Sequence, residues 1–296
     1  MISRAGWVGV CKQIDRLVLT VLLVALSPAI AAGGTLLVYA GAAGKPPTEE
    51  AARRFEKETG IHVDLVFGGS GHVLSQMRLT RRGDLYFPGS SDYMEKAKRA
   101  GDVFPETERI VVYLVSAINV QAGNPKGIHG LEDLLRPGIR VAIANPEAVC
   151  VGSYAVEIIE GALTPEQRRR FRRNLVNYTA SCSKTAAVVS LKAVDAVIGW
   201  RVFEFWDPER IETIPLEPGQ VQRIGYIPIA ISRFTRQRDT AQRFIDFLLS
   251  PRGRAIFARY CYFSTPQAAM AWVGADKPVG GEYLVPRAWL TPGDAR

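Results

Sequence analysis

Residues 62–99 read HVDLVFGGSGHVLSQMRLTRRGDLYFPGSSDYMEKAKR and contain one pattern twice. A short apolar strand (62–67, then 84–87) ends in a turn of Gly, Ser and Pro, and a helical stretch follows each turn (73–81, then 92–99). Strands and helices that alternate in this way predict an α/β sheet with mostly parallel strands. The turns at the carboxyl ends of such strands meet at one crevice, where ligands bind.

The same pattern extends in both directions along the chain. Upstream, TLLVY (35–39) precedes the small-residue turn AGAAG (40–44) and a helix that opens with Lys45-Pro46-Pro47. Downstream, further strand, turn and helix units lie between residues 138 and 200. We therefore expect a second group of turns that faces the first.

Two apolar runs, 110–120 and 224–231, have the length and composition of strands that cross between the two groups. A long helix is expected over 240–258. The pattern predicts a two-lobed clamshell hinged at the two crossings. Its parts are lobe 1 (residues 33–113 plus 226–263), lobe 2 (residues 114–225) and a C-terminal tail (residues 264–296).

The first 32 residues have the composition of a secretory leader, a signal peptide. Basic residues precede the apolar run LVLTVLLVAL (17–26), and Ala29-Ile30-Ala31 offers a small-x-small cleavage site. We expect cleavage near Ala31 or Ala32, which would place the mature chain in the periplasm or another extracytoplasmic compartment. The alternative is a leader that is retained as a membrane anchor.

Composition narrows the class of protein. The chain has 296 residues, of which 47% are hydrophobic and 22% charged, with a formal net charge of +8. These proportions exclude a wholly disordered chain, and no later stretch has the roughly 18 to 20 apolar residues of a spanning helix. The densest basic run, 168–173, lies on an amphipathic helical stretch, so we expect a solvated helix face and no nucleic-acid partner.

Residues that support metal or acid–base chemistry are few. His62, His72 and His129 show no metal-ligand spacing, and each stands alone on a strand or loop. Three cysteines follow the leader, and none of them forms a C-x-x-C pair. We therefore expect no metal, no cofactor and no catalysis.

The ordered set of motifs resembles the periplasmic solute-binding proteins of ABC importers, specifically the molybdate- and tungstate-binding family. The motifs are VYAGAAG (38–44), EEAARRFEKETGIHVDLVFGGSG (49–71), GDLYFPGSSDYMEKA (83–97), IANPEAVCVGSYAVEII (143–159), VDAVIGW (194–200) and IDFLLSPRGRAIFARYCY (245–262). The resemblance implies a type II periplasmic-binding fold whose two lobes clamp a tetrahedral oxyanion. It also implies a monomer that delivers its small anionic ligand to the membrane subunits of an importer.

Carried over to this chain, the resemblance implies five ligand positions, two of them altered. Ser70 stands where the family uses a hydroxyl and a main-chain N–H group. Ala43 stands where members usually place another serine. Val151 and Cys182 stand where main-chain N–H groups bind the anion. Trp200 replaces an aromatic hydroxyl and offers an indole N–H that can donate but not accept.

Helix N-termini attract anions, and small residues let the backbone approach a ligand. We therefore expect the cleft to collect Ala42, Ala43, Ser70, Gly89, Ser90, Val151, Cys182 and Trp200. Lys45, just past the altered first turn, is a further candidate that would add positive charge. The alternatives are that the glycines only shape turns, that Ser70 only caps a helix and that Lys45 is an exposed lysine.

Cys150 and Cys182 each stand at the start of a second-lobe helix that we place at the cleft. If the turns converge, their Cα atoms can lie within the roughly 4.4 to 6.8 Å that a disulfide allows. We expect a bridge in an oxidising compartment. The alternative is a reactive thiol whose pKa is lowered at a helix start.

Three functions remain open at this point. The first is capture of an oxyanion of the molybdate or tungstate type for an importer. The second, indicated by the altered Ala43 and Trp200, is binding of an organic anion such as a carboxylate or a phosphorylated metabolite. The third is an exported hydrolase with Ser70 as nucleophile, although GGSGH (68–72) does not match the G-x-S-x-G motif.

Overall fold

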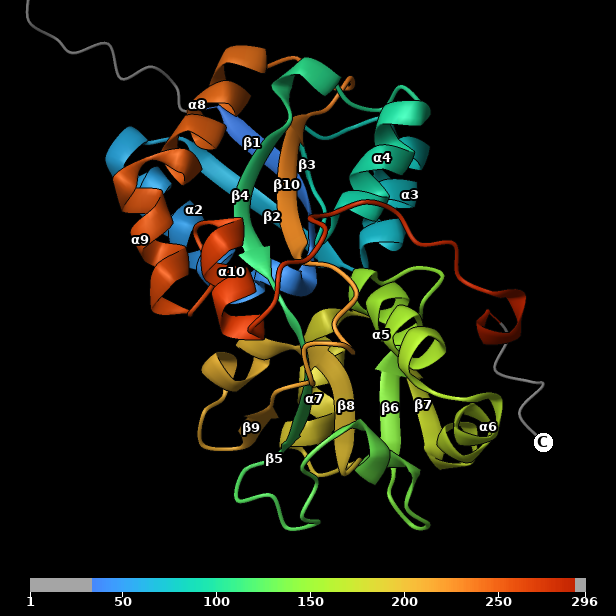
Figure 1. The fold of residues 1–296 in the computed structure, drawn as a ribbon. Helices are drawn as coiled ribbons and strands as arrows, with labels where there is room; N and C mark the ends of the chain where they lie inside the picture. Colours follow the sequence, from blue (N-terminus) through green and yellow to red (C-terminus); the bar gives the residue numbers. More distant parts are fainter. Residues whose placement is uncertain (1–33, 291–296) are drawn as a thin grey trace, which may run out of the picture. The chain divides into compact units, whose positions relative to one another are not determined.

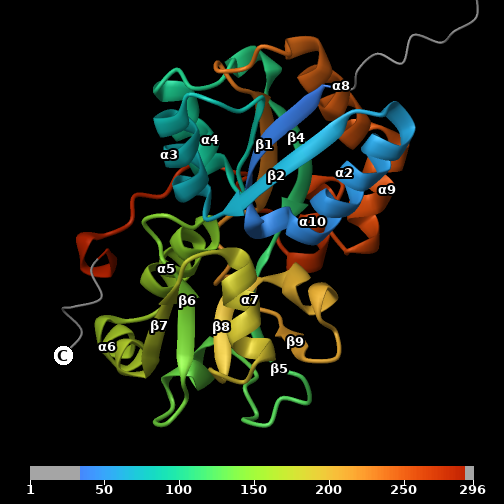
Figure 2. The same ribbon diagram turned by 180° about the vertical axis from the view of Figure 1, so that it is seen from behind.

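The computed structural model describes residues 34–290, and the predicted leader lies outside them. The described chain forms two five-stranded sheets with helices packed against them (Figures 1 and 2). The α/β class predicted from the alternating pattern is therefore confirmed. None of the described helices is both long and apolar enough to cross a membrane.

The first lobe is built on the sheet with strand order β2-β1-β3-β10-β4. Its strands are β1 (Thr35–Gly41), β2 (His62–Gly68), β3 (Leu85–Phe87), β4 (Arg109–Leu114) and β10 (Gly225–Ile231). β2 and β3 pair with β1 in parallel, whereas β10 runs antiparallel to its neighbours. The carboxyl ends of β1, β2 and β3 therefore share one edge, where three turns meet.

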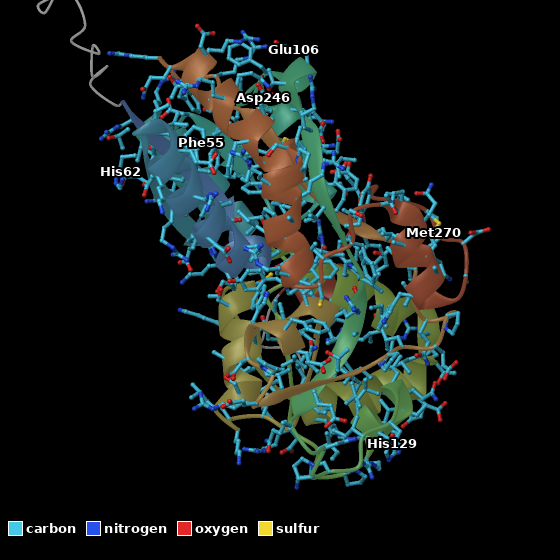
Figure 3. The ribbon with its side chains drawn as sticks, turned by 90° about the vertical axis from the view of Figure 1, so that its left-hand side faces the viewer. Phe55, His62, Glu106, His129, Asp246 and Met270 are labelled. Atoms are coloured by element: carbon cyan, nitrogen blue, oxygen red, sulfur yellow. The ribbon has the colours of Figure 1, made fainter. Side chains whose placement is uncertain are left out.

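Helices cover both sides of this sheet (Figure 1). They are α2 (Lys45–Thr59), α3 (Ser70–Thr80), α4 (Ser91–Arg99), α8 (Arg238–Leu249) and α9 (Pro251–Arg259), with short 3-10 turns η1 (Ala42–Gly44) and η2 (Pro105–Thr107). The ring of Phe55 on α2 lies 5.1 Å from that of Phe244 on α8, so residues far apart in the chain share one core (Figure 3).

The second lobe repeats the design on the sheet with strand order β7-β6-β8-β5-β9. Its strands are β5 (Ser116–Gln121), β6 (Val141–Ala144), β7 (Leu175–Thr179), β8 (Ala196–Trp200) and β9 (Ile211–Ile214). Its helices are α5 (Cys150–Ala162), α6 (Pro165–Asn174) and α7 (Cys182–Ser190), with 3-10 turns η3 (Leu131–Leu135) and η4 (Arg201–Trp206). β7 and β8 pair with β6 in parallel, so α5 and α7 begin at the same edge of the sheet.

Two predicted elements are divided in the structure. The apolar run 110–120 is two strands, because β4 ends before Val115 and β5 begins after it in the other sheet. The prediction of a single helix over 240–258 is wrong. The structure has two helices there, because α8 ends before Ser250 and α9 begins at Pro251. Proline has no N–H for the helix ladder, and Ser250 caps α9 by accepting the Gly253 N–H at 3.2 Å.

A buried ionic centre joins the two lobes. Arg223 precedes β10 on the second crossing, and only 5% of its side chain is exposed. It donates to Asp92 of α4 at 3.0 and 3.2 Å and to Glu157 of α5 at 2.7 Å, and its guanidinium lies 3.9 Å from the ring centre of Tyr154. Burial raises the pKa of Glu157, although Arg223 opposes this rise. One buried cation thus joins α4 of the first lobe to α5 of the second.

The predicted C-terminal tail contains two further elements, α10 (Pro266–Val273) and η5 (Arg287–Trp289). Between them the chain follows the second crossing, where Gly280 N–H donates to Ile224 O at 2.8 Å. Glu282 then pairs with Arg99 of the first lobe at 2.5 Å. Trp289 is buried in the second lobe, where it donates to Glu160 at 2.7 Å. This segment, residues 277–290, is the strap, and it contacts both lobes (Figure 1).

We predict that Trp289→Ala lowers the free energy of unfolding by about 3 kcal/mol, because a buried indole loses its packing and its hydrogen bond. Urea denaturation measures this change. Leu284→Ala is the matched control on the strap, because the Leu284 side chain is 93% exposed and its removal should cost less than about 0.5 kcal/mol. Equal stability of the two variants would contradict the anchoring role of Trp289.

Candidate ligand site

The three turns of the first lobe touch one another at glycines. A Cβ on Gly41 would stand 2.5 Å from Gly89 N and 2.6 Å from Ser70 Oγ, which is closer than real Cβ atoms come. Gly89 N–H donates to Ser70 Oγ at 2.9 Å. Because this bond uses the oxygen as an acceptor, the Ser70 hydroxyl proton remains free to donate. The predicted convergence of these turns is confirmed.

The same turns lie against the second lobe. A Cβ on Gly69 would stand 2.7 Å from Ala148 O and 3.0 Å from Ala180 O, which precede α5 and α7. Gly71 N–H donates to Ala148 O at 2.9 Å, and the Tyr93 hydroxyl donates to Glu147 O at 2.9 Å. Helix α7 also packs against η1. The described structure is therefore one in which the lobes meet.

Two cysteines stand where the lobes meet. Cys150 and Cys182 are the first residues of α5 and α7, and each is 1% exposed. Their sulfurs lie 3.6 Å apart, and both are free thiols. The predicted bridge is thus not formed in this structure, because the two helix starts hold the sulfurs at contact distance and not at the roughly 2.05 Å of a disulfide.

The Cys182 thiol is protonated in this state. Burial raises its pKa well above the ordinary value, and the neighbouring Cys150 acts in the same direction. The Val151 N–H and the nearby Trp200 indole oppose them, although the indole N–H does not reach hydrogen-bonding geometry with the sulfur. The alternative of a thiol with a lowered pKa is therefore wrong for Cys182 in the described state, because burial outweighs the helix start.

Three buried polar groups near these helix starts have no hydrogen-bond partner among residues 34–290: Ser90 Oγ, Tyr154 Oη and Trp200 Nε1. The rings of Tyr154 and Trp200 are in edge contact, with centres 4.8 Å apart. Burial raises the pKa of Tyr154, so its hydroxyl keeps its proton at neutral pH. Buried donors without partners are rare in native proteins, because each costs about 1 to 3 kcal/mol. They indicate a missing acceptor.

We call the following set the turn cluster: residues 41–43, 69–70 and 89–90 of the first lobe, residues 150–151 and 181–182 of the second, and Tyr154 and Trp200. Ala42, Ala43 and Val151 of this set are buried, as are its serines. Ala43 contributes its carbonyl, which accepts the Tyr262 hydroxyl at 2.6 Å. Sequence reasoning missed Tyr154, although it lies one helical turn after Cys150 and therefore shares its face of α5.

The structure does not bring Lys45 to the turn cluster. Its side chain is 40% exposed, pairs with Glu49 at 3.7 Å and lies over the ring of Phe67. Arg201, the neighbour of Trp200, also points elsewhere and donates to Cys261 O at 2.7 Å. An anion at the turn cluster would therefore meet N–H and O–H groups and helix N-termini in place of these two cations.

A cavity of about 670 Å³ opens beside the turn cluster. It is lined from both lobes, by Gly71, Tyr93, Asn145 and Ala148 among others. Its charged lining residues are Arg78, Lys96, Arg99 and Glu147, of which Arg78 pairs with Asp102 and Arg99 with Glu282. His72 is exposed and lines this cavity. Ser70 Oγ accepts its hydrogen bond from the Gly89 N–H. The described residues hold no group of three His, Cys, Asp or Glu side chains that could bind a metal ion.

Known proteins share this fold. The molybdate-binding protein ModA of Mycobacterium bovis is 24% identical over 84% of this chain and 96% of its own length. The periplasmic molybdate-binding protein of Azotobacter vinelandii has the same fold, with a TM-score of 0.66 at 18% identity over 77% of this chain and 98% of that one. The periplasmic binding protein AfuA of Actinobacillus pleuropneumoniae was solved with fructose-6-phosphate. It has a TM-score of 0.66 at 17% identity, over 84% of this chain and 89% of its own.

These relatives are binding proteins, and the resemblance to the molybdate-binding family and its two-lobed fold is confirmed. The family model for bacterial extracellular solute-binding proteins matches residues 36–263, which is most of the chain. The chain therefore belongs to the bacterial extracellular solute-binding protein family.

Proposed function

We propose that this protein captures a tetrahedral oxyanion of the molybdate or tungstate type at the turn cluster. The observation that carries this proposal is the set of buried, unpartnered groups of Ser90, Tyr154 and Trp200. An indole N–H can only donate, and a hydroxyl can donate as well as accept. The ligand that suits these groups is one whose whole surface consists of acceptors.

Helix N-termini supply the charge that such a ligand needs. Helices α3, α5 and α7 all begin at the turn cluster. Each N-terminus carries about half a positive charge and presents N–H groups without partners. Main-chain donors at Ser70, Val151 and Cys182 therefore support anion binding without a lysine or arginine side chain.

Capture requires that the lobes separate. The side chains of the turn cluster are almost completely buried, so an anion reaches them only when the contacts across Gly69 and Gly71 open. A ligand that binds donors of both lobes shifts the population toward the state in which the lobes meet. We propose that this state is recognised by the membrane subunits of an ABC importer, and that the protein acts as a monomer without catalysis.

The place of action follows from the leader. We propose that residues 1–32 export the chain to the periplasm or an equivalent extracytoplasmic space, with cleavage near Ala31. Retention of the leader as an anchor would keep the protein beside its importer. Either arrangement serves the same transport function.

A second candidate ligand is an organic anion, and the cavity beside the turn cluster favours it. A carboxylate or phosphate group would bind the same donors, and the rest of the molecule would extend into the cavity lined by Arg78, Lys96 and Arg99. AfuA, which shares the fold, was solved with a sugar phosphate. A hydrolase is not proposed, because the hydrogen bond that the structure gives Ser70 Oγ comes from the Gly89 N–H, and GGSGH (68–72) does not match the G-x-S-x-G motif.

The first prediction tests the unpartnered indole. Trp200→Phe should weaken the binding of molybdate or tungstate by about 1 to 3 kcal/mol, because a donor to the ligand is lost, while the ligand-free protein loses no hydrogen bond. Trp206→Phe is the matched control, because its N–H already donates to Tyr262 at 3.2 Å. That variant should lose stability and keep its affinity. Calorimetric titration and thermal unfolding of both variants separate the two effects.

The second prediction concerns the free proton of Ser70. Ser70→Ala should weaken oxyanion binding by about 1 to 3 kcal/mol, and Gln76→Ala, an exposed position on the same helix that does not line the cavity, should not. Titration with molybdate, tungstate and sulfate measures this difference. Unchanged affinity in Ser70→Ala would move the site away from this turn. A wild type that binds none of the three but binds a sugar phosphate or carboxylate would favour the second candidate.

The third prediction uses Gly69, whose Cβ would collide only with atoms of the second lobe. Its φ of −62° suits any residue, so Gly69→Ala should leave the first lobe intact and oppose the contact between lobes. We expect affinity to fall at least tenfold with little loss of thermal stability. Gly130→Ala is the control, because a Cβ there meets nothing within 4 Å. Wild-type affinity in Gly69→Ala would show that binding does not need this contact.

A further inference from the structure

The thiols of Cys150 and Cys182 are part of the surface at which the lobes meet. A Cβ on Gly89 of the first lobe would stand 2.6 Å from Cys150 Sγ and 3.5 Å from Ser70 Oγ. Cys182 Sγ lies 3.6 Å from Cys150 Sγ, at the start of the neighbouring helix α7. Both sulfurs therefore lie among the groups to which the proposed function assigns the anion.

We propose that Cys150 and Cys182 form a modification site at which a low-molecular-weight disulfide oxidises the pair to a bridge, and that the bridged protein binds the oxyanion more weakly. The inference rests on the proposed function, because it concerns the same site. It goes beyond that function by making affinity depend on the oxidation state of two side chains.

The reaction is a thiol–disulfide exchange in two steps. The thiolate of one cysteine attacks a sulfur of the oxidant RSSR, forms a mixed disulfide and releases RS⁻. The thiolate of the second cysteine then attacks the cysteine sulfur of the mixed disulfide, forms the Cys150–Cys182 bond and releases a second RS⁻. The two protons of the cysteines leave with the two RS⁻ groups as RSH, and the oxidant takes up the two electrons.

Loss of the thiol protons changes what the site can offer an anion. In the thiol pair one S–H group is available to the neighbouring sulfur and the other to a ligand. In a bridge neither sulfur carries a proton, so both present only lone pairs to the oxyanion. The sulfurs also move from 3.6 Å to about 2.05 Å apart, which displaces the starts of α5 and α7 and their N–H groups.

Closure of the lobes protects the pair. Each cysteine is 1% exposed where the lobes meet, and exchange needs a thiolate that the oxidant can reach. Burial raises the pKa of Cys182, so this state also keeps the thiol protonated. Oxidation therefore takes place in the open form, and a bound oxyanion, which favours the contact between lobes, opposes it.

Thermodynamic reciprocity makes the inference quantitative. If the thiol form binds the oxyanion more tightly than the bridged form by some factor, saturating oxyanion must shift the thiol–disulfide equilibrium toward the thiols by the same factor. We expect a factor of about ten, which corresponds to the loss of one donor. Two independent measurements must therefore agree.

The experiment uses the mature protein with Cys261→Ser, which leaves the pair as its only cysteines. Buffers of reduced and oxidised glutathione set the oxidation state, and counting of thiols in the denatured protein reports the bridged fraction with and without saturating molybdate. Calorimetric titration gives the molybdate affinity of the reduced and the bridged protein. The variant Cys150→Ser/Cys182→Ser, which keeps both proton donors but has no thiol at the site to react with glutathione, should bind molybdate independently of the glutathione ratio.

Each outcome has one meaning. An affinity ratio that equals the shift in the thiol–disulfide equilibrium supports the inference. Equal affinity of the reduced and bridged proteins, or no bridge in oxidised glutathione, overturns the inference and leaves the proposed function standing. Absence of binding of molybdate, tungstate and sulfate in both oxidation states overturns the proposed function and this inference with it.

Discussion

The close approach of backbone at three glycines is the constraint on which the rest of the site depends. Gly41, Gly69 and Gly89 each stand where an added Cβ would lie within 2.7 Å of a neighbouring atom. The contacts of Gly41 join turns of one sheet, those of Gly69 join the two lobes, and those of Gly89 do both. Because no side chain separates these turns, helix N-termini and hydroxyl groups from both halves of the chain converge on one small volume. The absence of side chains at these three glycines is what allows the donor groups to lie so close together.

Arg223 provides a second contact between the two lobes, in addition to that at Gly69. It binds Asp92 in one lobe and Glu157 in the other, and its guanidinium packs on Tyr154, whose ring in turn packs on Trp200. A buried cation between two carboxylates tolerates the loss of neither partner, because an unpaired charge is expensive in a low-dielectric interior. The ionic centre and the turn cluster therefore form one continuous set of contacts across the hinge.

The alternation of strands, turns and helices was sufficient to predict the α/β class and the convergence of the turns that carry Gly41, Ser70 and Gly89. These features depend on local periodicity and on how parallel sheets place their turns. Tyr154, Arg223 and the strap could not be predicted, because their roles arise from contacts between segments far apart in the chain. Lys45 was a candidate because it follows Ala43 in the chain, but its side chain pairs with Glu49 and lies over Phe67, since proximity in sequence does not show the direction of a long side chain.

The strap lies largely beyond the part of the chain that the family model matches, residues 36–263. It runs alongside the crossing at Ile224 through Pro278 and Gly280, and it is then attached to the first lobe by Glu282 and to the second by Trp289. Any separation of the lobes of the kind that the proposed function requires would lengthen the path between the two attachments, so the strap would restrain how far the lobes can part.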